Sequence, residues 1–576
     1  MVAVELDCRD PQRHLLGVQL TVMPQRARLR LQLPAWTPGS YLIRDYVRQL
    51  EALQVVQAGT SLPLRRSTPA RWELDCNPEA GPITVTYRVM ATELSVRTCH
   101  MDQQHAFLAL AAVVLEVEGE RWSPHRIQMQ LPQGWSAFVP LPEHPQGGWI
   151  ARDFDQLVDT PIEAGPHRSL HFEVGGIPHR WVTWGDGGGG DAWLLERFPN
   201  LIRDVQQVCL SCCRLMGEER PASDSYGFVL HLLDEGYGGL EHDDSTVLVY
   251  GRQRLEQPQG YRRLLQLVAH EYLHQWNVRR LRPQQLCPID YQQASVIPTL
   301  WFAEGVTSYV DQLLPLAAGI TDLDALLQDL GDDLSRYRLT PGRQVQSLRC
   351  SSQEAWVKLY KADAYAPDSQ VSYYLKGAVV ALCLDLQLRR DGSSLAAVLQ
   401  QLWSSHGRWG RGYSEADLHG AFVAHSPALA ELLPRWLDGL DDPDLESYLW
   451  DVGLRLEAEM STGAWAGLSL SSVEGALTVQ RVWRDGPAER AGVMVGDEVL
   501  ALDGQRLRQP GPWGQALRQD SPQVLLISRR SQLHSLTLRP EAPAVERYRL
   551  VPVDPISPQQ AQLQAQWCRL DTAVPC

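Results

Sequence analysis

The segment His270-Glu271-Tyr272-Leu273-His274 constrains the fold of this 576-residue chain more than any other feature. Residues four positions apart lie above one another on one face of an α-helix, so a helix lets His270 and His274 bind one metal ion together. Glu271 then emerges within reach of a water molecule held by that ion. Apolar residues recur at helical spacing before the motif and predict this helix: Tyr261, Leu264, Leu265, Leu267 and Val268. The alternative is a chance match on an ordinary helix, so the prediction depends on the surrounding sequence.

A zinc site that performs catalysis normally has three protein ligands and one open position, so a third ligand should follow further along the chain. Glu304 is the candidate, because burying a lone carboxylate among apolar side chains is costly unless a positive charge compensates it. Its bulky neighbours are Trp301, Phe302, Val306 and Tyr309. The alternative places Glu304 on the exposed side of a helix. Together, His270, His274 and Glu304 predict a zinc site.

Five segments, in order along the chain, resemble the glycyl aminopeptidase family of gluzincin metallopeptidases. Many members of this family carry a PDZ domain after the catalytic part. The segments are Trp36–Tyr41 with Arg44, Asp45 and Tyr46; Gly238–His242 with Ser245; His270–Asn277 with Arg279, Arg280, Arg282 and Pro283; Trp301–Tyr309; and Ser372–Gly377. An ordered set of this kind is far more specific than any single motif.

The resemblance implies that Glu241 binds the α-ammonium group of a substrate. A carboxylate near the metal pairs with a free amino terminus and rejects a peptide that lacks one, so cleavage is exopeptidic. Gly238 and Gly239 would let substrate and backbone approach closely. The alternative is a polar surface turn, because Glu241 opens a run of polar residues.

Tyr374 lies two residues before Lys376-Gly377, the spacing at which the resemblance implies a tyrosine that stabilises the transition state. A phenol hydroxyl aimed at the developing oxyanion donates a hydrogen bond where charge accumulates. Tyr373 is adjacent and is expected to point elsewhere. The alternative is that both tyrosines are packing residues.

The implied reaction is removal of small N-terminal residues, glycine and alanine above others, from peptides. Zinc would lower the pKa of a bound water to roughly 7, and Glu271 would take the proton of that water as general base. Two other function classes stay open. One is a scaffold protein on a peptidase fold whose PDZ domain binds peptides, and the other is a zinc endopeptidase in which Glu241 has another role.

Composition limits the partners and the location. The formal net charge of −15 and a sequence pI near 5.6 argue against binding to nucleic acid or anionic membranes. The start of the chain carries charges and no apolar signal-peptide core. The longest apolar run, 106–115, is shorter than the ~20 residues of a membrane span. Eleven scattered cysteines fit a reducing compartment, so we expect a cytoplasmic protein.

The pattern of apolar residues along the sequence predicts a multidomain α+β fold. We expect an N-terminal β-rich domain (1–180), a thermolysin-like catalytic domain with a helical C-terminal subdomain (181–458), a PDZ domain (459–540) and a C-terminal extension or loosely ordered tail (541–576). Alternating apolar residues such as Val18, Leu20 and Val22 indicate the strands of the first domain. In the PDZ domain, Gly467 and Leu468 are candidates to hold a peptide C-terminus by their backbone amides, and such domains bind a peptide as an added strand. The alternative is a PDZ domain that only packs against the catalytic part.

Overall fold

The structure is a computed structural model, and it describes residues 1–185, 192–509 and 511–570. The chain forms two compact units. Unit 1 comprises Met1–Val296, Ala317–Thr321 and Ala396–Ala421, and unit 2 comprises Ile297–Leu316, Asp322–Leu395 and Phe422–Cys576. In the described part of the chain, no helix has both the length and the apolar character needed to cross a membrane.

Unit 1 begins with a β-rich domain, which confirms the predicted N-terminal fold. Its largest sheet has seven strands in the order β14-β12-β1-β2-β8-β4-β5, and two four-stranded sheets have the orders β13-β15-β10-β9 and β11-β3-β7-β6. In β2, Val18, Leu20 and Val22 are buried, and the residues between them are partly exposed, as the alternation predicts. The elements are β1 Val2–Asp7, β2 Leu15–Val22, β3 Arg28–Gln32, β4 Leu50–Gln57, β5 Thr60–Ser61, β6 Arg65–Thr68, β7 Arg71–Asp75, β8 Ile83–Met90, β9 His100–Met101, β10 Ala106–Ala109, β11 Glu116–Val117, β12 His125–Gln130, β13 Ser136–Phe138, β14 Trp149–Ala151, α1 Phe154–Val158 and β15 Pro161–Gly165.

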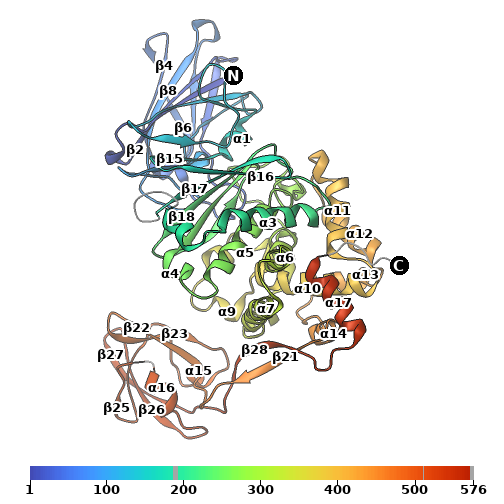
Figure 1. The fold of residues 1–576 in the computed structure, drawn as a ribbon. Helices are drawn as coiled ribbons and strands as arrows, with labels where there is room; N and C mark the ends of the chain where they lie inside the picture. Colours follow the sequence, from blue (N-terminus) through green and yellow to red (C-terminus); the bar gives the residue numbers. More distant parts are fainter. Residues whose placement is uncertain (186–191, 510, 571–576) are drawn as a thin grey trace. The chain divides into compact units, whose positions relative to one another are not determined.

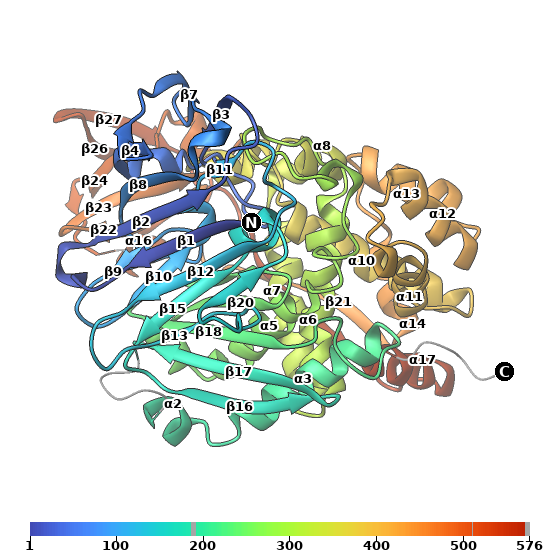
Figure 2. The ribbon, with the colours of Figure 1, turned by 90° about the horizontal axis from the view of Figure 1, so that it is seen from above.

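A second sheet of unit 1, with the strand order β16-β17-β18-β20-β19, supports the helix of the histidine motif. Strands β17, β18 and β20 are parallel, and β19 is an antiparallel strand at the edge. Helices α3 and α5 contact each other and cover one face of this sheet (Figure 1), whose strands are seen side by side in Figure 2. The elements are β16 Ser169–Val174, β17 Ile177–Trp184, α2 Ala192–Arg197, α3 Leu201–Leu215, β18 Tyr226–Leu233, β19 Tyr237–Glu241, β20 Ser245–Gly251, α4 Arg252–Leu255 and α5 Gly260–Leu273.

The catalytic part of unit 2 is helical, which confirms the predicted helical subdomain. It opens with a short π-helical segment, η6, that continues directly into α6. The elements are η6 Trp301–Gly305, α6 Val306–Ala317, α7 Leu323–Arg338, α8 Leu348–Gln353, α9 Ala366–Ser369, α10 Tyr373–Arg390, α13 Leu429–Asp438 and α14 Leu445–Asp451. Two further helices, α11 Leu395–Ser405 and α12 Glu415–His425, contain the boundaries between the units.

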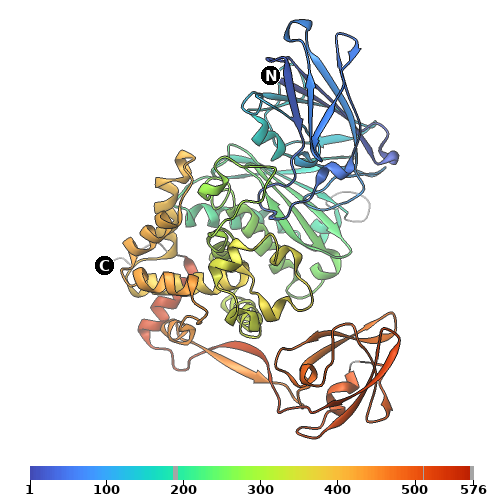
Figure 3. The same ribbon diagram turned by 180° about the vertical axis from the view of Figure 1, so that it is seen from behind.

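The C-terminal part of unit 2 contains the PDZ domain. Its strands follow the order β22-β23-β24-β26-β27, with β25 paired to β24. Val479, Leu525 and Ile527 are fully buried in its core. Strands β21 and β28 form an antiparallel ribbon that leads into and out of this domain (Figure 3). The elements are β21 Leu454–Met460, β22 Leu468–Val473, β23 Ala476–Val482, α15 Pro487–Arg490, β24 Glu498–Leu502, β25 Gln505–Arg506, α16 Gly511–Ala516, β26 Gln523–Arg529, β27 Gln532–Leu538, β28 Val545–Pro552 and α17 Pro558–Arg569.

The prediction of a loosely ordered tail is wrong for residues 545–569, which form β28 and α17. Ser557 and Gln560 make a capping box at the start of α17, which satisfies backbone donors that the helix leaves unpaired. Trp567 is fully buried, and its indole Nε1 donates to the Tyr309 hydroxyl at 2.7 Å. One buried aromatic side chain therefore anchors a helix whose glutamine-rich sequence suggested disorder.

Candidate active site

Helix α5 carries the histidine motif to its C-terminal end, as the apolar spacing predicts. The rings of His270 and His274 lie with centroids 4.6 Å apart and planes at 89°. The Nδ1 atom of His274 is 2.6 Å from the Asn277 carbonyl oxygen. Because a carbonyl oxygen only accepts, Nδ1 must carry the proton, and Nε2 keeps its lone pair. A backbone partner of this kind fixes the tautomer of a metal-binding histidine, so this half of the site fits a metal ion.

Glu271 lies against the backbone of strand β19. Its side chain is only 4% exposed. A Cβ atom added to Gly239 would collide with the Glu271 carboxylate, so only glycine permits this approach. The sequence predicted close approach at Gly238 and Gly239. At Gly239 the group in close approach is the Glu271 side chain, whereas Gly238 has a φ of +148° and open space around it.

Glu241, at the end of β19, is 4% exposed. Its Oε1 atom accepts no hydrogen bond in the described part of the chain. A Cβ at Gly39 (φ +81°) would lie 2.5 Å from Oε2 and 2.7 Å from Oε1, so the loop after Trp36 packs directly against this carboxylate. Potential ligand atoms of Glu241, Glu271 and His274 all lie within 4.8 Å of one another. Unit 1 thus gathers three of the predicted site residues, and Glu241 is not in an exposed turn.

A buried ion network anchors the chain next to Glu241, and sequence reasoning missed it. Arg279, which follows α5, lies 2.8 Å from Asp159 and 2.9 Å from Asp243. Burial would raise the pKa of Asp243, but Arg279, Arg282 and other arginines hold that pKa well below its usual value. Asp159 also contacts His242, the residue after Glu241, at 3.1 Å. The arginines belong to the family motif, but no local pattern identifies Asp159 as their partner.

Unit 2 carries Glu304 and Tyr374 on two helices that are in close contact. Glu304 is 2% exposed within η6, so the exposed-helix alternative is wrong. A Cβ at Gly305 would lie 2.5 Å from the Gly377 Cα, and these two glycines let η6 approach α10. Single π-helical turns occur often at functional sites.

Tyr374 lies in the first turn of α10 and is partly exposed. Burial and the nearby Glu304 carboxylate raise the pKa of Tyr374 well above its usual value, so the phenol keeps its proton. Tyr373 is fully buried. The expectation that the two rings point apart is wrong, because they stack with centroids 4.7 Å apart. At the first turn, no preceding helical turn occupies the space into which both side chains lean.

In the PDZ domain, Gly467 and Leu468 lie where the edge strand β22 begins. Gly467 has a φ of +71°, and a Cβ there would lie 2.9 Å from the Pro487 Cδ atom. The backbone N–H of Trp483 donates to the Gly467 carbonyl at 2.9 Å. Gly467 and Leu468 therefore lie in a tight turn at the start of an edge strand.

Models of known families match three parts of the chain. The Peptidase M61 N-terminal domain matches residues 3–166, M61 glycyl aminopeptidase matches residues 263–380, and a PDZ domain matches residues 478–530. None of the curated proteins compared with the chain matches it.

Solved structures also resemble the chain. A crystal structure of an aminopeptidase N family protein from Idiomarina loihiensis has 29% sequence identity and a TM-score of 0.90, with 99% of this chain and 100% of that chain covered. An M1 zinc metallopeptidase from Deinococcus radiodurans has 16% identity and a TM-score of 0.46, with 77% and 94% covered. With both catalytic-family domains and a PDZ domain matched in order, the chain belongs to the M61 glycyl aminopeptidase family of metallopeptidases.

Proposed function

We propose that this protein is a zinc-dependent aminopeptidase that removes small N-terminal residues, glycine and alanine above others, from peptides. The observation that carries the proposal is the buried Glu241 carboxylate in unit 1, close to Glu271 and His274, with one oxygen that accepts no hydrogen bond in the described part of the chain. Burying a carboxylate oxygen that accepts no hydrogen bond is costly. The ammonium group of a free amino terminus supplies donors to this oxygen and adds a positive charge to that of Arg279.

We infer that His270, His274 and Glu304 hold the zinc ion. The tautomer of His274 supports this assignment in unit 1, and the burial of the Glu304 carboxylate supports it in unit 2. Two imidazoles and one carboxylate form a ligand set that zinc peptidases use. When bound, the ion would supply Lewis-acid chemistry, polarising the scissile carbonyl and acidifying water.

The side chains of this chain then have separate tasks. Glu271 accepts the proton of the attacking water and delivers it to the leaving nitrogen, and its contact with Gly239 holds the carboxylate in place. Tyr374 donates its hydroxyl proton in a hydrogen bond to the oxyanion. Glu241 accepts hydrogen bonds from the α-ammonium group and so sets the cleavage position one residue from the end.

The preference for small N-terminal residues has two supports. One is the resemblance of the motifs, and the other is the match of residues 263–380 to the glycyl aminopeptidase model.

A direct test compares hydrolysis of a glycyl peptide with hydrolysis of its N-acetylated form. We expect kcat/KM to fall roughly 100-fold or more on acetylation, because Glu241 would lose a charged partner in a buried site. Glu241→Gln should weaken cleavage of the free peptide and remove most of this discrimination. Glu256→Gln, which alters an exposed carboxylate of the same unit, is the matched control. Equal cleavage of both peptides by the unaltered protein would instead identify an endopeptidase.

We also infer that the PDZ domain binds the C-terminus of a peptide at β22. The support is that β22 is an edge strand, with Gly467 and Leu468 at its start, and edge strands accept peptides by strand addition. Titration of the full-length protein with C-terminal peptides, and with the same peptides amidated, tests this. Binding that is insensitive to amidation, or no binding, contradicts it.

A further inference from the structure

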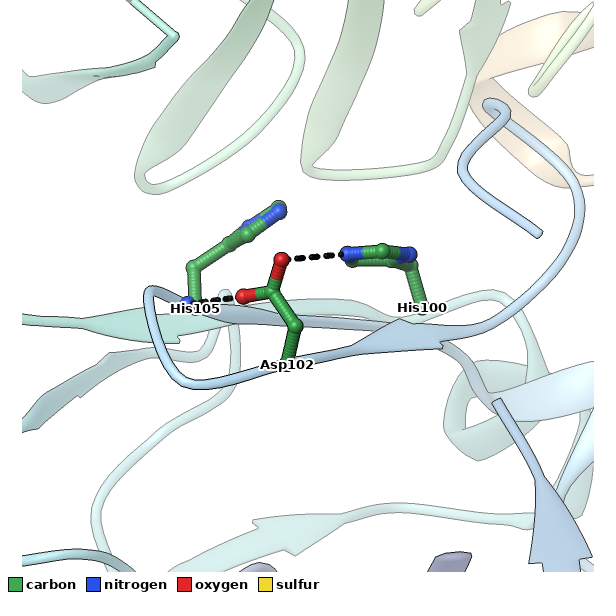
Figure 4. Close-up of side chains that lie close together, drawn as sticks. All are labelled: His100, Asp102 and His105. Carbon is green, nitrogen blue, oxygen red and sulfur yellow. Dashed lines mark hydrogen bonds and ion pairs between the residues drawn. The ribbon is translucent and has the colours of Figure 1, made fainter. Parts of the chain in front are cut away.

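A second cluster of imidazoles and carboxylates lies in the N-terminal domain of unit 1. Strands β9 and β10 form a tight hairpin whose ends carry His100, Asp102 and His105. A potential ligand atom from each of these residues lies within 4.8 Å of the others. Figure 4 shows the Asp102 carboxylate between the two rings. We propose that His100, Asp102 and His105 bind a divalent transition-metal ion, separate from the ion proposed for the active site.

The hairpin orients the Asp102 carboxylate. Its Oδ1 atom accepts hydrogen bonds from the backbone N–H groups of Gln104, at 2.7 Å, and of His105, at 3.1 Å. Its Oδ2 atom is left for other partners and lies 3.2 Å from the His100 Nε2 atom. Two ligands that are each about 2.0–2.1 Å from a tetrahedral ion are about 3.3 Å apart. The separation of these two atoms therefore suits an ion between them.

Glu163, on β15, fixes the tautomer of His105. Its Oε1 atom is 2.8 Å from His105 Nδ1, and its Oε2 atom is 2.8 Å from His231 Nε2. An ionised Glu163 only accepts, and with that form His105 Nδ1 carries the proton and its Nε2 holds a lone pair. The His105 side chain is 0% exposed, and its Nε2 has no hydrogen-bond partner in the described part of the chain. A carboxylate behind a histidine whose far nitrogen is unused is the arrangement found around metal-bound histidines.

The charges of the cluster also favour a cation. The Glu163 side chain is fully buried, and the charged or polar side chains that contact it in the described structure are three imidazoles, those of His105, His167 and His231. Burial raises the pKa of Glu163 and so disfavours its charged form, and the hydrogen bond with His105 opposes this rise. A divalent ion on the far side of His105 supplies a positive charge one ring away.

The surroundings hold the ligands rigidly and leave one side open. Trp184 stacks on His105 with ring centroids 3.8 Å apart. The His100 and Asp102 side chains are 18% and 30% exposed, so an ion can enter from solvent. Two imidazole nitrogens and one carboxylate oxygen suit Zn²⁺, Fe²⁺ or Co²⁺ more than Mg²⁺ or Ca²⁺. Such an ion would link the turn between β9 and β10 to Glu163 on β15 through the His105 ring.

Zinc analysis of the full-length protein, loaded with Zn²⁺ and then dialysed, tests this proposal. We expect about two zinc ions per chain in the unaltered protein, and about one in His100→Ala and in Asp102→Asn. Both changes lie at partly exposed positions, and Asn can still accept the turn hydrogen bonds. His171→Ala removes an exposed histidine outside the cluster and should keep about two ions.

The two metal sites are distinguished by a second variant and a second readout. His270→Ala should lose one ion and the peptidase activity, whereas His100→Ala should lose one ion and keep the activity. If His270→Ala keeps the ion at His100, Asp102 and His105, the new site is supported independently of the function proposed for the active site. Crystals grown with Zn²⁺ should show an anomalous signal beside His105 Nε2. Full zinc content in His100→Ala, or a signal centred on Glu163 or absent from the cluster, would overturn the assignment.

Discussion

The candidate residues of the two units are brought together in different ways. In unit 1, Glu271 and Glu241, proposed for proton transfer and amine binding, lie where segments far apart in the sequence meet. In unit 2, Glu304 and Tyr374 lie on two helices that pack together at a pair of glycines. Gly39, strand β19 and helix α5 meet around Glu241 and Glu271. Gly305 and Gly377 set the spacing between η6 and α10. The residues proposed to move a proton and to bind the substrate lie in unit 1, and those proposed as third zinc ligand and oxyanion donor lie in unit 2. Substitutions in the two units should therefore differ in their effects on zinc content and on kcat.

The largest effect is expected from unit 2, for Glu304→Ala. Two histidines alone bind zinc weakly, so the variant should contain one zinc ion fewer per chain than the unaltered protein and should have almost no peptidase activity. Metal analysis and kcat on a glycyl peptide measure both quantities. Glu446→Ala removes an exposed carboxylate of the same unit and serves as control. Unchanged zinc content in Glu304→Ala would show that Glu304 is not a zinc ligand.

Glu271→Gln should separate chemistry from metal binding in unit 1. Loss of a general base lowers kcat by roughly 10²- to 10⁴-fold, whereas the zinc content should stay at the unaltered value because Glu271 is not a proposed ligand. The same two measurements apply, with Glu256→Gln as control. If the variant retains both its zinc and its full activity, another residue is the base.

Tyr374→Phe tests the second contribution of unit 2. Removal of one oxyanion donor lowers kcat by about 10²- to 10³-fold, with KM nearly unchanged because the hydrogen bond strengthens only in the transition state. Tyr373→Phe is the matched control, since this neighbouring ring is fully buried and stacks on Tyr374. An equal loss of kcat in both variants would mean that the pair acts through packing.

Local patterns in the sequence predicted much of the active site. The apolar spacing before His270 predicted α5, and the bulky residues around Glu304 predicted its burial. Both inferences depend on neighbours within one helix, where periodicity is a direct signal. The tail was mispredicted because composition cannot show that Trp567 finds a buried partner in Tyr309.

Contacts between residues far apart in the sequence produce no local pattern from which they could be predicted. His105 and His231 are 58 and 68 residues from Glu163 in the sequence. The pairing of β10 with β15 brings His105 close to Glu163, whereas His231 comes from β18 of another sheet. The contact of Gly39 with Glu241 is of the same kind. The motif that contains Gly39 was visible in the sequence. Only the structure shows why glycine is needed there, because a Cβ would collide with the Glu241 carboxylate.

Lys376 gives the smallest effect and tests the packing of unit 2 rather than its chemistry. The side chain is fully buried and its Nζ donates to the Arg343 carbonyl at 3.3 Å. Burial lowers the pKa of Lys376 to about 8; Asp442 opposes this shift and Arg343 adds to it. The unfolded value is about 10.4. Below pH 8 both states carry the proton, and burying the cation costs up to about 3 kcal/mol.

Between pH 8 and about 10.4 the unfolded chain binds more protons than the folded protein, so the stability should rise with pH in this window as the cost disappears. Lys376→Met should therefore raise the unfolding midpoint at pH 7 and should flatten its increase towards pH 10. Thermal unfolding of both proteins across this range measures the difference, with the exposed Lys361→Met as control. A variant that is less stable than the unaltered protein at pH 7 would show that the Arg343 contact outweighs the burial of the charge.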